Sequence, residues 1–376
     1  MRGFIVEIAA LRILHVYKVY LPEDESGAPR VIWQIAEGLA PYGVESHVLA
    51  LAQKPAAGPI KIGRHVVHQA RRDFDLASTG LSFSVFRKFR DLARGADIVH
   101  YHHPWPLQDL MHFFVRPRCP SVVTYHSDIV KQRFILPFYR PLMHRFLASV
   151  DHIVATSPDY LETSPVLRRV AAKTSVIPIG LPEREAPNES DLRKWRDRVG
   201  EGFFLFVGVL RYYKGLPFLL EAARRTGLPV VVVGEGEMRG AIERAALENV
   251  TLLGQVSDTD KEALLSLCRA FVFPSHLRSE AFGIALVEAA RAGKPMISCE
   301  IGTGTSYVNV NEETGLIVPP ADADALGAAM QSLADDSEAA ARLGRNARAR
   351  YQRLLRAEDM SRKYLALYER LASAAR

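Results

Sequence analysis

Short runs of apolar residues alternate with amphipathic stretches along most of the chain. Uninterrupted apolar runs of about four to eight residues, bounded by turn residues, are typical of strands buried on both faces. Apolar positions at helical spacing fill several of the intervals, including 30–42 and 283–291. This alternation predicts an α/β protein with parallel sheets, whose ligands bind at the carboxyl ends of the strands. The predicted strands are 12–19, 45–51, 64–69, 98–102, 122–125, 152–155, 203–210, 230–233, 250–256, 270–275, 295–299 and 315–320.

The length of the chain predicts two domains, because 376 residues are too many for one compact core. The interval 180–190 has no apolar periodicity and holds Pro182 and Pro187, so we place the boundary there, with a first domain over 1–184. The second domain covers 185–355. Residues 1–10 are apolar but carry Glu7 and lack a signal-peptide cleavage pattern, which indicates an upstream extension.

Composition narrows the class of protein further. Hydrophobic residues at 48% and charged residues at 24% are ordinary globular values, and a net charge of +6 permits contact with an anionic surface without indicating nucleic acid. The three cysteines are far apart, which indicates a reducing compartment and argues against a zinc site or disulfides. No apolar run approaches the roughly 20 residues of a membrane span. We therefore expect a cytoplasmic protein.

Two carboxylates flank the start of the predicted helix 283–291. Glu280 lies in the loop after strand 270–275, and Glu288 is expected about two turns into the helix. Backbone N–H groups at a helix N-terminus bind phosphate, while carboxylates accept hydrogen bonds from sugar or ribose hydroxyls. Taken alone, Glu280 could equally be a residue that caps the loop, and Glu288 could equally be a solvated helix residue.

The residues around the two carboxylates favour the ligand-binding interpretation. Ser-Glu-Ala-Phe-Gly-Ile followed by Leu-Val-Glu-Ala resembles the E-x₇-E motif of the family 4 retaining glycosyltransferases, which have the GT-B fold. The resemblance implies two facing Rossmann-like domains, with the acceptor in the first and a nucleotide-sugar donor in the second. It assigns Glu280 to the sugar hydroxyls, Glu288 to the ribose, and Phe282, Gly283 and Ile284 to the donor site. It also implies that the last helix, 356–376, crosses back to the first domain.

Two cations follow the apolar strand 203–210. A lysine offers phosphate a point charge and an arginine a bidentate fork, so Arg211 and Lys214 fit a diphosphate, although either could be a solvated surface residue. The family usually has an arginine where this chain has Val209, and Lys-Gly where it has Lys214-Gly215. We carry Arg211 over as the substitute for the missing arginine.

Glycines and small residues follow three further strands. Gly234 and Gly236 could belong to a dinucleotide fingerprint, but Arg239 replaces its third glycine. The resemblance instead assigns Gly234 to the nucleotide and places Val256 in the base-contacting stretch.

The loop 301–307 follows the strand 295–299. Its hydroxyls and free N–H groups can cradle a phosphate and the sugar's oxygens, so Thr303, Gly304 and Thr305 are donor-binding candidates. The family more often has a Gly-Gly-Pro-Glu type of loop here. The version in this chain resembles a subset that builds bacterial surface polysaccharide from GDP-mannose or GDP-rhamnose.

The first domain offers two candidates. Gly27, between strand 12–19 and helix 30–42, resembles the glycine loop that approaches the donor phosphate, where the family more often has two glycines; a plain turn is the alternative. His126 ends strand 122–125 and resembles the histidine beside the transferred sugar, the alternative being a structural hydrogen bond. His102 and His103 are adjacent, so they point to opposite faces of a strand and make a poor metal pair. We expect no metal site.

A basic and aromatic character marks 131–150 and 83–90. Such a surface can rest on anionic lipid headgroups at the inner face of the membrane, or it can simply be solvated.

The resemblance implies retaining transfer of a hexose, best assigned as mannose from GDP-mannose, without a divalent metal and with GDP preferred over UDP. The acceptor would be a hydroxyl of a glycan or polyprenol-linked glycan in O-antigen or exopolysaccharide synthesis. The alternatives are an NAD-dependent oxidoreductase, suggested by Gly234 and Gly236, and a non-catalytic nucleotide-binding scaffold.

Overall fold

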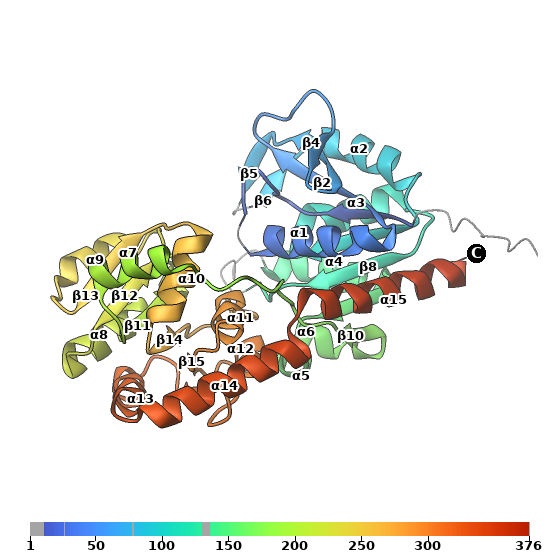
Figure 1. Cartoon of the computed structure of the whole chain (residues 1–376). Helices are drawn as coiled ribbons and strands as arrows, with labels where there is room; N and C mark the ends of the chain where they lie inside the picture. Colours follow the sequence, from blue (N-terminus) through green and yellow to red (C-terminus); the bar gives the residue numbers. More distant parts are fainter. Residues whose placement is uncertain (1–10, 26, 77–78, 130–135, 376) are drawn as a thin grey trace, which may run out of the picture. The chain divides into compact units, whose positions relative to one another are not determined.

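The computed structural model describes residues 11–25, 27–76, 79–129 and 136–375, and the chain divides into two compact units (Figure 1). The first unit comprises Met1–Ala155, Pro165–Ile177 and Ala357–Arg376, and the second comprises Thr156–Ser164 and Pro178–Arg356. The expected extension, residues 1–10, lies outside the described residues. The predicted class, α/β with parallel sheets in two units, is confirmed.

The units differ from the predicted domains in two segments. Residues 156–164 and 178–184 were expected in the first domain but are counted with the second. Hydrogen bonds explain this placement. The Thr163 hydroxyl donates to the Gly302 carbonyl, and the Leu181 N–H donates to the Leu355 carbonyl at 2.9 Å. Both segments therefore form part of the second unit's own bonding network.

The first unit is an eight-stranded sheet in the order β10-β9-β8-β7-β1-β2-β4-β3, with a two-stranded hairpin β5-β6 beside it. All neighbours in the large sheet are parallel except β3 and β4. The strands are β1 (Arg12–Val16), β2 (Glu45–Ala52), β3 (Ile60–Ile62), β4 (His65–Arg71), β5 (Phe74–Leu76), β6 (Thr79–Leu81), β7 (Ile98–His103), β8 (Ser121–Tyr125), β9 (His152–Ala155) and β10 (Thr174–Val176). The helices are α1 (Ala28–Leu39), α2 (Ser84–Ala93), α3 (Pro106–Val115), α4 (Leu136–Ser149), α6 (Pro165–Arg168) and α15 (Ala357–Ala375).

The second unit is a six-stranded parallel sheet in the order β13-β12-β11-β14-β15-β16. Its strands are β11 (Phe204–Val207), β12 (Val230–Val233), β13 (Val250–Gly254), β14 (Ala270–Phe273), β15 (Met296–Cys299) and β16 (Gly315–Val318). Its helices are α5 (Pro158–Thr163), α7 (Glu189–Val199), α8 (Leu216–Thr226), α9 (Arg239–Ala245), α10 (Asp258–Leu267), α11 (Ile284–Arg291), α12 (Gly304–Val308), α13 (Ala323–Asp335) and α14 (Ser337–Leu354).

Both sheets reverse their strand order at one point. In the second unit the order runs outward from β11 to β12 and β13 on one side, and through β14 to β16 on the other. In the first unit β1 and β7 are the corresponding neighbours. Loops leaving two adjacent strands at such a point diverge to opposite faces, which opens a crevice where ligands bind in open α/β sheets. The topology therefore places one candidate ligand site in each unit.

The apolar runs form the cores, as their patterning predicts. β11, β12 and β14 are almost wholly buried, and Phe204, Phe206, Val232 and Ile297 belong to one cluster in the second unit. The observed strands are shorter than several predicted ones: β1 ends at Val16 and β11 at Val207. The apolar residues beyond these ends lie in the loops that leave the sheet.

The last helix belongs to the first unit, where α15 packs on α1 (Figure 1). A Cβ added at Gly38 would lie 2.1 Å from the Ser361 Oγ, so this glycine permits the close approach. Tyr364 and Tyr368 of α15 are fully buried against the sheet.

Among the described residues, no helix combines the length and apolar content needed to cross a membrane.

Candidate active site

The strand order of the second unit reverses at β11 and β14, and the loops that follow these two strands meet there. Tyr212–Lys214 forms a 3-10 turn after β11, and Gly215 then begins α8 with a φ of 73°. A Cβ at Gly215 would lie 1.9 Å from the carbonyl oxygen of Pro274, the first residue after β14. Only glycine fits this approach, and it brings the two loops together.

Lys214 and Glu280 meet between these two loops. The Lys214 Nζ lies 2.5 Å from the Glu280 Oε2, and only 12% and 13% of the two side chains are exposed. The ammonium also sits over the Phe273 ring, 4.5 Å from its centroid. The structure thus joins two residues that the sequence suggested separately, and it presents a cation and a carboxylate at the strand ends.

Arg211 lies three residues before Lys214 but is exposed. Among the described residues, its guanidinium has no ion pair with a carboxylate. Val209, at the position where an arginine was expected, is 39% exposed. Arg211 therefore lies on the same loop as Lys214. Within the described part of the chain, no carboxylate forms an ion pair with it.

Glu288 projects from α11 and is also ion-paired. Its Oε1 lies 2.6 Å from the Nζ of Lys261 on α10, and both side chains are largely buried. Because α11 begins at Ile284, Glu288 lies just over one turn into the helix, not two as expected. Gly283 precedes this helix with a φ of 84°, a conformation that favours glycine.

The loop after β15 packs directly on the loop that carries Glu280. The Gly304 N–H donates to the Ala281 carbonyl at 2.8 Å, and a Cβ at Gly304 would lie 2.5 Å from the ring of buried Phe282. Thr303 and Thr305 are buried, and their hydroxyl oxygens are 3.3 Å apart. The loop after β15 and the loop that carries Glu280, both predicted as donor-binding segments, are thereby held together at the start of α11.

Gly234 and Gly236 lie against the loop that follows β11. A Cβ there would lie 2.0 Å from the Gly208 carbonyl oxygen, and one at Gly236 would lie 2.6 Å from the Leu210 carbonyl oxygen. These glycines let the loop after β12 approach the loop after β11. Both glycines therefore contact protein backbone. This contact explains why the chain has Gly-x-Gly here without the rest of a dinucleotide fingerprint. Val256 follows β13, whose Gly254 carbonyl accepts the Gly234 N–H at 2.8 Å.

Sequence reasoning missed three residues that organise this site. Lys261 pairs with Glu288, and Arg278 donates to the Gly302 carbonyl at 2.6 Å. Glu300 accepts the Gly302 N–H at 2.9 Å and the Ser306 hydroxyl at 2.8 Å. A motif comparison finds residues at fixed spacing, whereas these act through contacts with other elements. Only the position of Arg278, two residues before Glu280, offered a signal.

The first unit places its candidates around β1, β7 and β8. Gly27 precedes α1 with a φ of 58°, and an added Cβ would meet no atom within 4 Å. His126 directly follows β8 and is partly exposed, and its Nε2 lies 2.9 Å from the Nδ1 of buried His102. His103 instead stacks on Tyr125, as expected for neighbours on opposite faces of a strand.

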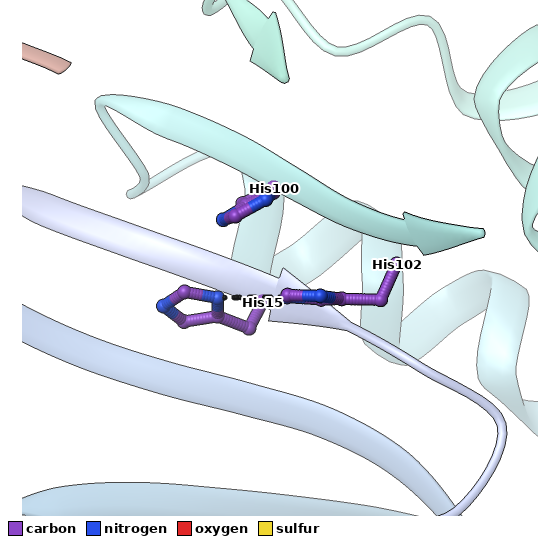
Figure 2. A group of neighbouring side chains, drawn as sticks. All are labelled: His15, His100 and His102. Atoms are coloured by element: carbon purple, nitrogen blue, oxygen red, sulfur yellow. Dashed lines mark hydrogen bonds between the residues drawn. The ribbon is translucent and has the colours of Figure 1, made fainter. Parts of the chain in front are cut away.

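Three buried imidazoles crowd this point: His15 on β1, and His100 and His102 on β7 (Figure 2). Their nitrogens lie within 4.8 Å of one another, close enough for a metal ion. However, His100 already bonds the Tyr368 hydroxyl at 2.6 Å and the Thr124 hydroxyl at 2.7 Å. A dication held by three neutral imidazoles in this buried place would also lack a compensating charge. Hydrogen bonding explains the cluster better than metal ligation.

Comparison with known proteins identifies the family. The profile of Glycosyltransferase Family 4 matches residues 26–184, and that of Glycosyl transferases group 1 matches residues 188–350. The D-rhamnosyltransferase WbpZ of Pseudomonas aeruginosa is 53% identical over 353 residues, 92% of this chain and 93% of that protein. The chain belongs to glycosyltransferase family 4. The O-antigen chain mannosyltransferase C of Escherichia coli is 45% identical over 366 residues, 96% of this chain and 99% of that protein.

Solved structures agree on the fold of this family 4 glycosyltransferase. The sucrose-phosphate synthase of Thermosynechococcus elongatus has a TM-score of 0.79 at 22% identity, covering 97% of this chain and all of that one. Anabaena HepE in complex with UDP has a TM-score of 0.75 at 19% identity, covering 96% of this chain and 100% of that one. The protein is thus a GT-B type transferase, and this family membership replaces the alternatives of an oxidoreductase and a non-catalytic scaffold.

Proposed function

We propose that this protein transfers a hexose, with mannose from GDP-mannose as the first choice, to a hydroxyl of a glycan or lipid-linked glycan. The product would be part of an O-antigen or exopolysaccharide. The similarity to a bacterial rhamnosyltransferase and to an O-antigen mannosyltransferase, each over more than nine-tenths of the chain, supports this class of donor and acceptor.

The Lys214–Glu280 pair is the observation that carries the proposal. The diphosphate of an arriving donor would draw Lys214 and Arg211 to its oxygens, and Glu280 would be released to accept hydrogen bonds from the sugar. A cation aimed at charge that develops on the leaving group stabilises the transition state more than the ground state. Two protein cations would thus supply the charge that other transferases take from a divalent metal.

The remaining residues have roles in binding. Glu288 would accept the ribose hydroxyls, and His126 would contact the transferred sugar. Thr303, Gly304 and Thr305 would contact the sugar and its phosphate with hydroxyl and N–H groups, beside Phe282, Gly283 and Ile284. Gly234 and Val256 would contribute backbone contacts to the nucleotide, and Gly27 would leave room for the donor phosphate.

We propose front-face transfer with retention at the anomeric carbon. The bond from this carbon to the phosphate oxygen breaks, a bond to the acceptor oxygen forms on the same face, and the leaving phosphate takes the acceptor's proton. No carboxylate of the chain then needs to act as a nucleophile. A glycosyl adduct trapped on Glu280 would contradict this mechanism.

Thermal unfolding with millimolar GDP, UDP or NAD, in the presence of a chelator, tests the nucleotide. A ligand that binds only the folded state, at a hundredfold excess over Kd, stabilises it by about 2.7 kcal/mol. We expect GDP to give the largest rise in Tm, and transfer from GDP-mannose to persist in chelator. Selective stabilisation by UDP would keep the enzyme class and overturn the choice of donor, whereas loss of transfer in chelator would overturn metal independence.

We also propose that the first unit rests on anionic membrane lipid. Helices α2, α3 and α4 pack side by side, and Phe83, Phe114 and Phe138 around them are 77%, 76% and 86% exposed. Basic residues accompany these rings, among them Arg87, Arg90, Arg140 and Arg145. Exposed aromatic rings within a basic surface fit the boundary between headgroups and acyl chains. Of the expected basic and aromatic stretch 131–150, residues 131–135 lie outside the described part of the chain.

Co-sedimentation with vesicles tests this surface. We expect binding to phosphatidylglycerol-containing vesicles and weak binding to pure phosphatidylcholine. Phe114→Ser with Phe138→Ser should reduce binding at least tenfold, since each buried CH₂ contributes about 0.8 kcal/mol. Tyr42→Ser, which removes an exposed aromatic ring elsewhere, is the matched control.

A further inference from the structure

A chain of three imidazoles leads from the core of the first unit to His126. The His126 Nε2 lies 2.9 Å from the His102 Nδ1, and the His102 Nε2 lies 3.1 Å from the His15 Nδ1. The rings of His102 and His126 are stacked at 20°, and those of His15 and His102 at 28°. Figure 2 shows the inner part of this chain, with the hydrogen bond from β1 to β7.

All three rings are neutral at physiological pH. Burial lowers the pKa of His15 and of His126 to about 3, and burial together with the neighbouring imidazoles holds the pKa of His102 well below its usual value. A neutral imidazole has one N–H and one bare nitrogen. When three such rings are joined by two hydrogen bonds, both bonds must run in the same direction, so one tautomer fixes the other two.

The inner end of the chain sets this direction. The Nε2 of His15 is buried, and it has no hydrogen-bond partner in the described part of the protein. Buried N–H groups without an acceptor are rarer in proteins than acceptors without a donor. The proton of His15 therefore belongs on Nδ1, where it is donated to the His102 Nε2. His102 in turn donates from Nδ1 to the His126 Nε2.

His100 does not interrupt this chain. Its ring is 4.3 Å from that of His102, but its nitrogens bond Tyr368 and Thr124. The Thr124 hydroxyl oxygen is a further 2.9 Å from that of Tyr364. Tyr368 and Thr124 thus occupy both nitrogens of His100 and leave His102 to the chain of three.

We propose that His15 and His102 are positioning residues that hold His126 in its Nδ1–H tautomer, so that His126 presents a hydrogen-bond donor to an oxygen of the substrate. The contact between His126 and the substrate rests on the proposed function. The tautomer itself is a property of the protein alone. A hydroxyl, ring or phosphate oxygen accepts from this N–H, whereas the opposite tautomer would offer a bare nitrogen and could only accept.

Nitrogen-15 NMR of the histidine-labelled full-length protein tests the tautomer directly, because protonated and bare ring nitrogens resonate far apart. Loss of one ring in His126→Gln assigns the signals of His126. We expect the free enzyme at pH 7.5 to hold His126 in the Nδ1–H form. A predominant Nε2–H form would overturn the proposal, whether or not the protein transfers mannose.

Two variants of His102 separate positioning from packing. An asparagine amide lies near the position of the imidazole Nδ1, so His102→Asn keeps a donor for His126. A glutamine amide reaches the position of Nε2, so His102→Gln keeps the bond to His15 and loses the one to His126. We expect a mixture of His126 tautomers only in the glutamine variant, with kcat/KM reduced about tenfold there and largely restored in the asparagine variant.

His68→Gln is the matched control. It removes a different histidine pair from the same sheet, in which the His47 Nδ1 lies 2.9 Å from the His68 Nε2. The tautomer of His126 should not change. An unchanged tautomer in His102→Gln, or the same mixture in all three variants, would overturn the proposal.

Discussion

The Lys214 ammonium forms a 2.5 Å ion pair with the Glu280 carboxylate, so the cation and the anion of the candidate donor site neutralise each other in the free protein. In the proposed function, each partner exchanges the other for a group of the donor when the donor binds. The pair holds both side chains in place before the donor arrives, and its rupture opposes the binding of a nucleotide that carries no sugar.

Glu280→Gln should separate nucleotide binding from sugar transfer. The amide cannot neutralise Lys214, so the cation becomes available to diphosphate and GDP affinity is retained or rises a few-fold. Transfer falls about 10²-fold or more, because the amide is a weaker acceptor for the sugar hydroxyls. Isothermal titration with GDP and a transfer assay measure the two effects. Parallel losses of GDP binding and transfer would contradict this assignment.

Lys214→Met removes the other partner. We expect transfer to fall about 10²- to 10³-fold and GDP binding to weaken, since the diphosphate loses a charge and Glu280 is left without its cation. Lys194→Met is the control, because its pair with Asp260 at 2.6 Å is on the surface of the same unit. A transferase that keeps its rate in Lys214→Met would exclude Lys214 from the diphosphate site.

Glu288 should discriminate ribose from deoxyribose. Wild-type protein should bind GDP more tightly than 2′-deoxy-GDP or 3′-deoxy-GDP, because one hydroxyl contact to the carboxylate is lost. Glu288→Gln should reduce that preference about tenfold, as charged hydrogen bonds contribute about 1.5–3 kcal/mol. Competition binding measures the ratio. Equal ratios in both proteins would place the ribose elsewhere.

Gly234→Ala should destabilise the second unit by about 3 kcal/mol or more. Its φ of 134° is unfavourable for alanine, and the new Cβ would lie 2.0 Å from the Gly208 carbonyl oxygen. Gly227→Ala separates the effect of the backbone conformation from that of the steric contact, because Gly227 has a φ of 69° but no atom within 4 Å of an added Cβ. It should lower the free energy of unfolding by about 1–2 kcal/mol. Urea unfolding measures the stability of both variants. Similar losses would show that the protein relaxes around the new Cβ and avoids the clash with the Gly208 carbonyl oxygen.

Acid should destabilise the first unit through its buried histidines. Burial lowers the pKa of His103 to about 3, so this ring stays neutral in the folded protein while the unfolded chain takes up a proton near pH 6.5. The contribution of His103 to the free energy of unfolding is therefore complete above about pH 6.5 and is lost as the pH falls toward 3. His103→Phe should therefore flatten the pH dependence of the unfolding free energy by about 1.4 kcal/mol per pH unit between pH 6 and 4. An unchanged slope would mean that His103 is protonated in the folded state.

The class of fold and the candidate residues of the donor site could be predicted from residue patterns along the chain. Apolar runs separated by helical patterns are typical of parallel sheets covered by helices. The spacing from Glu280 to Glu288 is a local property of one loop and one helix. Lys214 followed from the same logic, since a lysine beside a strand end is visible in the chain itself.

The tertiary structure decided how those residues are combined. The ion pairs of Lys214 with Glu280 and of Lys261 with Glu288 join segments that are 66 and 27 residues apart. The imidazole chain depends on strand register. His15 on β1 lies opposite His100 on β7, and His102, two residues further along β7, bonds both His15 and His126. Periodicity shows which face of a strand is buried, but not which strands are neighbours. Partner choice therefore follows from the order of strands in the sheet, which residue patterns along the chain do not contain.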